Sequence, residues 1–183
     1  MAAMRKAPGE LELVQSFVNT LDRETDADAL DSPAALRDWL VDRELLERGA
    51  RATGLELRRA IAVREALRAL LVANNGGWLD PDAVAVLEAA VPWCGLVVVF
   101  DRRGRIAVEP TRQGAGGAVG RLLATSANAM ADGRWCRLKA CWADDCRWAF
   151  YDWSRNRSGR WCVMTVCGNR AKVRAHRARR RLR

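Results

Sequence analysis

The stretches Cys141-Trp-Ala-Asp-Asp-Cys146 and Cys162-Val-Met-Thr-Val-Cys167 decide the fold of the C-terminal part of this 183-residue chain. Each pair of cysteines is separated by four residues, and 15 residues lie between the two pairs. Turns of this kind present four thiolates to one ion, and Zn²⁺ takes four thiolates tetrahedrally in closed structural sites. The 50 residues from 134 to 183 are too charged to form a sufficient apolar core, so a bound metal would supply folding free energy. We predict one structural Zn²⁺ held by Cys141, Cys146, Cys162 and Cys167.

The 15 residues between the cysteine pairs are rich in aromatic side chains. We expect one strand within Arg147–Trp153 and a second at Arg160–Trp161, joined by a turn at Ser154–Gly159. Aromatic residues in so small a module are more often its core around the metal than a stacking platform for single-stranded bases. Trp153, which lies next to the turn, is the better candidate for exposure.

The positive charge of the chain is concentrated around these cysteines. Residues 134–183 hold 15 Lys/Arg and 3 Asp/Glu, a formal charge of +12, whereas residues 1–133 hold 16 and 19, a formal charge of −3. Four thiolates on one Zn²⁺ would still leave the C-terminal part at about +10. Such a patch is the electrostatic signature of nucleic-acid binding, the alternative being a solubilising tail that binds nothing specific.

A final helix over about 168–181 would carry much of this charge, with Cys167 at its start, where the helix dipole favours a thiolate. Arginines at three- and four-residue steps would share one face and contact phosphates, largely independently of sequence. Asn169 or Arg170 would reach base edges, although Asn169 and Gly168 also fit a purely structural turn that delivers Cys167 into the helix. The predicted nucleic-acid contacts are Asn169, Arg170, Lys172, Arg174, Arg177, Arg179, Arg180 and Arg181.

The N-terminal part shows helical periodicity. Residues 11–21 fit a short strand or a helix equally well. Asp31-Ser32-Pro33 supplies a cap and a first-turn proline for a helix that we expect to run to about Glu47. Apolar residues recur at helical spacing over about 55–73, and a third helix is expected from Pro81 to its closing residue, Pro92.

A β-hairpin follows these helices. Leu96–Phe100 is β-branched and apolar, residues 101–104 form a turn, and Arg105–Glu109 is the return strand. The glycine-rich stretch at 113–117 lacks the Lys-Ser/Thr of a phosphate-binding P-loop. We interpret it as a flexible loop that enters a helix over about 118–131.

These patterns predict an α+β fold in two domains. Residues 10–133 would form a mostly helical domain with one β-hairpin, and residues 134–183 a small four-cysteine zinc finger, treble-clef-like or a zinc ribbon, that ends in the basic helix. The two remaining cysteines fall outside the zinc pattern. Cys136 is near enough to substitute as a ligand, but packing or a free thiol is favoured, and Cys94 fits a core position.

Composition excludes several classes of protein. The chain has no run of about 18 apolar residues that would span a membrane, and its first residues lack the apolar core of a signal peptide. We therefore expect a cytoplasmic protein, associated with the nucleoid if it binds DNA, whose thiols are reduced and available to a metal. A closed four-thiolate site has no position for catalytic water, and the single histidine, His176, lies in the basic tail. We do not expect an enzyme.

The cysteine module resembles a known family. After Cys141-x4-Cys146, the sequence reads Trp148-Ala-Phe-Tyr-Asp-Trp-Ser-Arg-Asn156 and then Arg160-Trp-Cys-Val-Met-x-x-Cys-Gly-Asn-Arg-Ala-Lys172. This pattern is similar to the CGNR zinc finger, named for the motif at residues 167–170, over about 139–177. The resemblance strengthens the prediction of a zinc site.

The N-terminal part resembles the domain that usually accompanies CGNR fingers. Phe17-Val-Asn-Thr-Leu21 and Leu36-x-x-Trp-Leu40 are similar to the start of the ABATE domain, and the resemblance spans about 10–130. Together the two resemblances imply a bacterial, stress-linked transcription regulator.

Three functions follow from these observations. The leading hypothesis is a zinc-dependent, DNA-binding transcription regulator whose N-terminal domain senses a ligand or a protein partner. The second is an RNA-binding or ribosome-associated zinc module. The third is a protein–protein adaptor or a thiol-redox sensor, in which oxidation of the zinc thiolates releases the metal. No segment of the sequence indicates a dimer interface, and the oligomeric state stays open.

Overall fold

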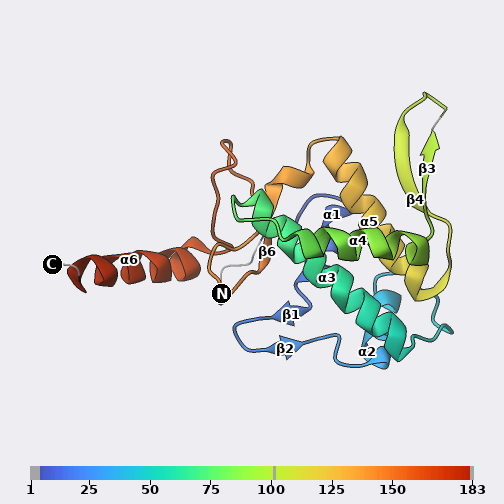
Figure 1. The fold of residues 1–183 in the computed structure, drawn as a ribbon, viewed down its shortest axis with the longest axis horizontal. Coiled ribbons are helices and arrows are strands. Elements are labelled where there is room, and N and C mark those ends of the chain that lie inside the picture. The colour runs from blue at the N-terminus through green and yellow to red at the C-terminus, as the bar shows by residue number, and fades with distance from the viewer. Residues whose placement is uncertain (1–4, 101, 182–183) are drawn as a thin grey trace.

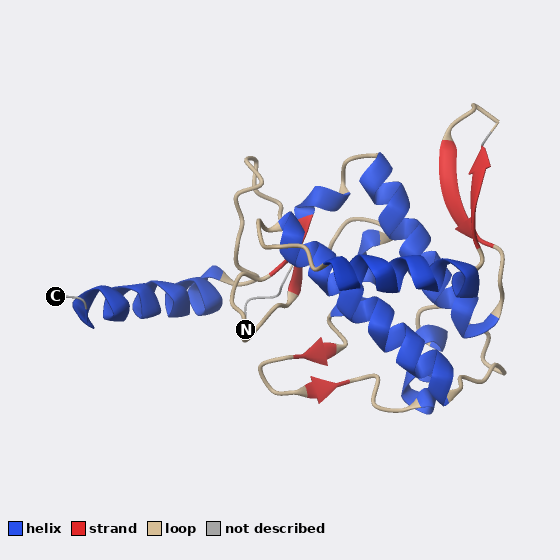
Figure 2. Ribbon diagram, viewed as in Figure 1, coloured by secondary structure: helices blue, strands red, loops and turns tan. Residues whose placement is uncertain are grey.

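The computed structural model describes residues 5–100 and 102–181. Helices form the body of the molecule, a β-hairpin projects at one end of the longest axis, and the last helix projects at the other (Figure 1). The strands form only short hairpins around this body, so the fold is α+β, as the sequence predicts (Figure 2). In chain order the elements are α1 Leu11–Val18, β1 Leu21–Asp22, β2 Ala27–Asp28, α2 Pro33–Val41, α3 Gly54–Asn74, α4 Pro81–Cys94, β3 Leu96–Phe100, β4 Ile106–Pro110, α5 Gly114–Ala131, η1 Trp135–Arg137, β5 Leu138–Ala140, β6 Ala149–Tyr151, η2 Met164–Gly168 and α6 Asn169–Arg181.

The N-terminal helices begin at residues that cap them. Ser32 accepts a hydrogen bond from the first turn of α2, and Thr53 and Glu56 form a capping box at the start of α3. Residues 11–18, for which the sequence leaves strand and helix open, are helical, because the apolar residues on one face of α1 are buried in the core.

The second predicted helix is shorter than expected. α2 ends at Val41 rather than near Glu47. Glu44 adopts a φ of +56°, and the Leu45 N–H donates to the Leu40 carbonyl at 2.9 Å. This C-terminal turn ends the helix and places Leu45 in the core. The spacing of apolar residues did not indicate that the helix ends here.

Residues 114–117 of the glycine-rich stretch form the first turn of α5, with Gln113 at the N-cap, and the prediction of a flexible loop is therefore wrong. A Cβ at Gly116 would lie 2.8 Å from the Trp93 carbonyl oxygen. A Cβ at Gly120 would lie 3.0 Å from the Cys94 carbonyl oxygen. The glycines are needed because α5 packs directly against the backbone at the end of α4.

The end of α4 also differs from the prediction. Pro92 lies within the helix instead of closing it. The helix ends at Gly95, whose φ is +64° and whose N–H donates to the Val91 carbonyl at 2.9 Å. A proline removes one backbone donor but does not prevent the residues after it from completing the last turn.

The predicted hairpin is present. β3 and β4 pair antiparallel, with Val98 opposite Val108 and Phe100 opposite Ile106. Asn128 of α5 holds this hairpin by donating to the Val108 carbonyl and accepting from its N–H, at 3.1 and 2.9 Å.

The strands of the cysteine module pair differently from the prediction. β6 lies antiparallel to β5, which precedes Cys141, and residues 160–161 form no strand. The first cysteine pair therefore lies in the connection between two paired strands. Lys139 lies opposite Phe150 in this register and is buried. Because a charged residue interrupts the apolar pattern that predicts a strand, the sequence did not indicate β5.

One core runs through both parts of the chain. Side chains of α1, α2, α3 and α5 form it together with side chains of η1, β5 and β6. The four cysteines lie beside it in a smaller cluster with Trp148 and Trp161. The zinc-finger strands are thus packed on α1 and α3 rather than held by the cysteines alone.

In the described part of the chain, no helix combines the length and the apolar character needed to cross a membrane.

Candidate metal centre and basic helix

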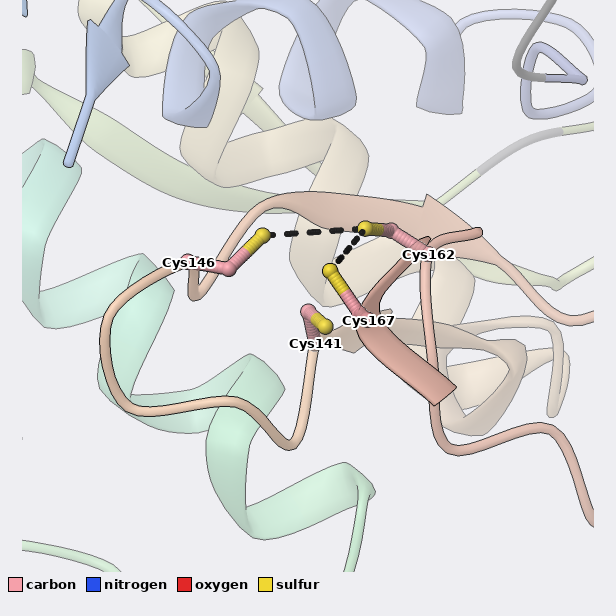
Figure 3. A group of neighbouring side chains, drawn as sticks. All are labelled: Cys141, Cys146, Cys162 and Cys167. Atoms are coloured by element: carbon pink, nitrogen blue, oxygen red, sulfur yellow. Dashed lines mark hydrogen bonds between the residues drawn. The ribbon is translucent and has the colours of Figure 1, made fainter. Parts of the chain in front are cut away.

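Two separate turns bring the four predicted ligands together (Figure 3). Cys141 follows β5 and Cys146 precedes β6, in a turn where the Cys146 N–H donates to the Ala143 carbonyl at 3.0 Å. The turn can close because the next residue, Arg147, has a φ of +48°. Cys162 lies just before η2, and Cys167 lies within η2, immediately ahead of α6.

The sulfur geometry fits zinc. The four Sγ atoms lie within 4.8 Å of one another. The Cys146–Cys162 and Cys162–Cys167 sulfur separations are 3.6 and 3.7 Å, far longer than a disulfide bond. Four thiolates bound tetrahedrally at about 2.3 Å from Zn²⁺ would be spaced at about 3.8 Å. Together with the buried position of three of the four, this spacing fits one structural Zn²⁺.

The ionisation of the cluster also indicates a cation. Hydrogen bonds from Cys146 and Cys162 lower the pKa of Cys141, and the bond to Cys141 raises the pKa of Cys146. Four buried thiols this close cannot all ionise by themselves, because like charges repel and burial disfavours the charged form. A dication would remove this restriction and bind all four as thiolates.

Arg170 connects the metal site to the N-terminal part of the chain. Its Nη2 donates to Cys167 Sγ at 3.4 Å. The same guanidinium forms two hydrogen bonds, at 2.7 and 3.1 Å, with Glu24 in the β1–β2 connection. These bonds, first to Glu24 and then to Cys167, raise the pKa of Arg170. Outer partners of this kind orient a metal ligand and support its charged form.

The other predicted contact residues are placed as follows. Asn169 Nδ2 donates to the Thr165 carbonyl at 3.1 Å, within the turn that leads into α6. Arg174 pairs with Asp145 at 2.7 Å. The side chains of Arg179 and Arg181 lie outside what the structure describes. Three further residues of α6 are exposed: Lys172, Arg177 and Arg180.

Several residues that sequence reasoning missed hold the metal site against the helical body. Asn19, in the stretch that resembles the ABATE start, accepts from the Ala149 N–H at 2.7 Å and donates to its carbonyl at 2.9 Å. Asn75 donates to the carbonyls of Ala140 and Arg160 at 2.8 and 2.9 Å. Asn74 donates to the carbonyls of Trp135 and Leu138 at 3.0 and 2.9 Å. The sequence indicates only that Asn74 and Asn75 end a helix, and the fold shows this second role.

The two remaining cysteines lie outside the group of four sulfurs. Cys94 is fully buried in the core, and burial raises the pKa of its thiol to about 11. Cys136 is partly exposed, and its Sγ lies 3.1 Å from an Arg157 donor and 3.3 Å from the Gly133 carbonyl.

A pocket of about 1200 Å³ lies on the N-terminal domain, between the α2–α3 connection and the first turns of α5. Its lining mixes acidic residues, such as Glu44 and Glu47, with Arg48, Arg112 and Arg121. A ligand or partner for this domain stays a prediction from the sequence.

Two family models match the chain. The model described as "Putative stress-induced transcription regulator" (ABATE) matches residues 11–133, which is well over half of the chain. The CGNR zinc finger model matches residues 137–180. No curated protein matches the chain. Both matches agree with the resemblances that the sequence shows, and neither family is described as an enzyme family.

Proposed function

We propose, from the premise that the chain belongs to the ABATE family of stress-induced transcription regulators, that it is a zinc-dependent regulator that binds duplex DNA. The observation that carries the proposal is α6, a basic helix of 13 residues that starts at the zinc site and projects away from the body (Figure 1). A helix of this length extends over about 20 Å and is narrow enough to enter a major groove. Such a protein would act in the cytoplasm, at the nucleoid.

The charges on α6 support this function. Among the residues whose side chains the structure describes, Lys172, Arg177 and Arg180 are exposed and form no ion pair. Arg174 is paired with Asp145, but the pair is exposed, so a phosphate can compete for it. Like-charge repulsion along α6 would be relieved on a DNA backbone.

The position of the zinc site next to α6 supports the proposal that DNA binding depends on zinc. Cys167 is the last buried cysteine before α6, and Arg170 in the first turn of α6 donates to its sulfur. Loss of the metal would therefore release the start of the helix from the body. We expect a chelator to abolish the tight, ordered binding of DNA and to leave weaker electrostatic binding.

The test is a titration of a fluorescent duplex with zinc-loaded protein at several salt concentrations. Each phosphate contact contributes about −0.9 to the slope of log K against log salt for B-form DNA. Replacing Lys172, Arg177 and Arg180 with Gln should reduce the magnitude of this slope by about 2 to 3. A control variant with Gln at Arg51, Arg58 and Arg102 removes the same charge from exposed positions in the N-terminal part.

Three outcomes would contradict the proposal. The first is an absence of duplex binding at low salt by fully zinc-loaded protein. The second is stronger binding of RNA in direct competition with the duplex, which would select the RNA-binding alternative. An equal effect of the α6 variant and its control would show that α6 is not the contact surface.

A further inference from the structure

The segment between β6 and Cys162 carries a second concentration of positive charge. Residues 154–160 read Ser-Arg-Asn-Arg-Ser-Gly-Arg, and their three arginines are all exposed. This loop, which follows β6 in the chain, lies on the side of the body from which α6 projects (Figure 1). After β6, only Cys162 and Cys167 belong to the group of metal ligands, so zinc binding does not account for the loop.

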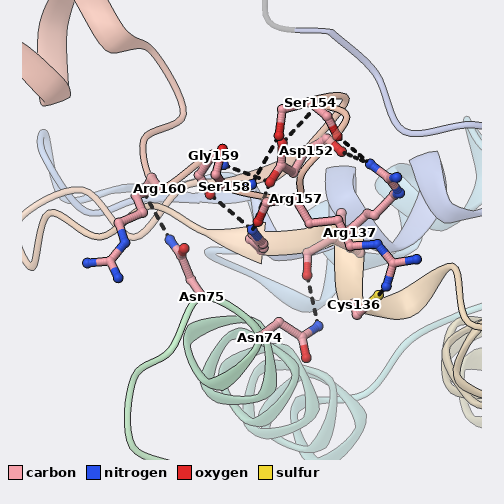
Figure 4. Close-up of polar contacts among 12 residues, drawn as sticks. Asn74, Asn75, Cys136, Arg137, Asp152, Ser154, Arg157, Ser158, Gly159 and Arg160 are labelled. Carbon is pink, nitrogen blue, oxygen red and sulfur yellow. Dashed lines mark hydrogen bonds and ion pairs between the residues drawn. The ribbon is translucent and has the colours of Figure 1, made fainter.

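A buried ion pair lies beneath this loop. Lys139 Nζ is 2.7 Å from Asp152 Oδ2, and the two side chains are 6% and 3% exposed. Lys139 also donates to the carbonyls of Arg157 and Gly159, and Asp152 accepts from the N–H groups of Ser154 and Gly159. A buried pair is tolerated because its remaining donors and acceptors are satisfied by the loop backbone (Figure 4).

Further contacts fix the loop from its sides. Arg137 donates to the carbonyls of Asp152 and Ser154 at 3.0 and 2.8 Å. Asn75, just after α3, donates to the Arg160 carbonyl at 2.9 Å (Figure 4). A Cβ at Gly159 would lie 2.8 Å from Asp152 Oδ1, so the close approach of backbone and carboxylate requires this glycine.

Two arginines of the loop contact neighbouring side chains, but those side chains do not neutralise their charge. Arg157 donates to Cys136 Sγ at 3.1 Å, and the Arg160 guanidinium lies 4.9 Å from the Trp142 ring centroid. Neither a thiol nor an indole carries a compensating negative charge. Within the described part of the chain, no carboxylate pairs with Arg155, Arg157 or Arg160, in contrast to Arg170 and Arg174 on α6.

We propose that this loop is a second phosphate-binding element, in which Arg155, Arg157 and Arg160 contact the DNA backbone while α6 contacts the groove. The inference rests on the proposed function and assigns to it a site outside the final helix. Because the loop backbone is already ordered, binding would lose little conformational entropy. Backbone contacts position a protein on DNA without reading its sequence, so the loop sets orientation and affinity rather than target choice.

The test uses the full-length, zinc-loaded protein and the same duplex titration. Replacing Arg155, Arg157 and Arg160 with Gln should lower the affinity at least tenfold at about 0.1 M salt and reduce the magnitude of the salt slope by about 2 to 3. Arg155→Gln alone, which disturbs no contact of the described residues, should reduce it by about 1. Zinc content and circular dichroism would show that the variants are folded.

The outcomes separate the inference from the proposed function. If the parent protein binds DNA and the loop variants bind like the Arg51/Arg58/Arg102 control, the loop is not a phosphate site, while α6 keeps its role. If the parent does not bind DNA at all, both proposals are overturned. A loss of affinity in the loop variants with an unchanged salt slope would also contradict a phosphate contact.

Discussion

Arg170 shows how far a single side chain can depart from the role that its charge indicates. The sequence predicts a phosphate or base contact for this residue. In the structure, its guanidinium lies between the sulfur of Cys167 and the carboxylate of Glu24. The arginine of the 167–170 motif therefore connects the metal centre to the N-terminal part of the chain, and its contact with a nucleic acid stays a prediction.

Replacing Arg170 with Ala should weaken zinc retention. The change removes a charge-assisted donor from a zinc thiolate, and loss of such outer partners typically lowers metal affinity by about 10- to 100-fold. Competition with a chromogenic chelator measures the effect. Lys172→Ala on the same helix removes the same charge without touching a ligand and should retain zinc like the parent. Equal retention by both variants would contradict the assigned role.

Asp152 should remain ionised well below the usual range of a carboxyl group. Burial by itself would raise its pKa, but hydrogen bonds from Lys139 and Ser154 outweigh this effect and lower the pKa from 3.8 to about 2. Because the folded-state pKa is depressed, the carboxylate contributes about 2 kcal/mol of stability above pH 4, which is lost as the pH falls toward 2. An NMR titration of the zinc-loaded protein should show no protonation of Asp152 between pH 7 and 4. A measured pKa of 4 or higher would contradict the buried ion pair.

At the scale of elements, asparagine side chains bond backbone groups of β5 and β6 that no neighbouring strand bonds. β5 and β6 are three residues each and pair only with each other. Asn19, after α1, bonds both backbone groups of Ala149 at the start of β6. Asn75, after α3, bonds the Ala140 carbonyl at the end of β5. The ends of two helices thereby extend a hairpin that is too short to be stable alone.

Asn19→Ala should therefore destabilise the protein and loosen the zinc finger. Without Asn19, the buried Ala149 N–H has no partner, and the Ala149 carbonyl keeps only the 3.3 Å bond from Gln15 Nε2. Leaving a buried donor without a partner costs about 1–3 kcal/mol. Urea unfolding gives the loss of stability, and the rate of zinc release to a chelator reports on the finger. Asn128→Ala is the matched control, because it removes the same two bonds from Val108 on the distant β3–β4 hairpin. If the control releases zinc as fast as Asn19→Ala, the link between α1 and the finger is not specific.

At the scale of the whole molecule, the two matched families share one core. Leu138, Ala140, Ala149 and Tyr151 of the finger belong to the same buried cluster as the residues of α1, α3 and α5. Separating the two parts would expose these side chains to water, at about 25 cal/mol per Å² of apolar surface. The two strands that flank the first cysteine pair therefore pack directly on helices of the N-terminal part.

A fragment of residues 134–183 should consequently fold poorly even with zinc. Zinc supplies folding free energy to the cysteine turns, but the faces of β5 and β6 that pack on α1 and α3 would be exposed. We expect limited dispersion in the NMR spectrum of the zinc-loaded fragment, and a single cooperative transition when the full chain unfolds. A fragment with a well-dispersed spectrum and a stability like that of the full chain would show that the finger is independent.

Patterns in the sequence were sufficient for features that depend on neighbouring residues. Helix caps, the β3–β4 hairpin and the two pairs of cysteines are local, so propensity and spacing predict them. The zinc prediction succeeded for a related reason, since metal–thiolate chemistry permits few arrangements of four cysteines. The concentration of positive charge in residues 134–183 was also predictable, because it follows from counting charged residues along the sequence.

Features that depend on contacts between distant segments could not be read in this way. The glycines at 113–117 look like a loop until the Trp93 carbonyl is placed against Gly116. The sequence does not show that Arg170 bonds Glu24 and Cys167, so it predicts an unpaired cation there. It also does not show that Lys139 pairs with Asp152, so it does not predict a buried strand around Lys139. The meaning of each of these side chains is set by a partner far away in the chain, and only the packing of the folded chain brings the two together.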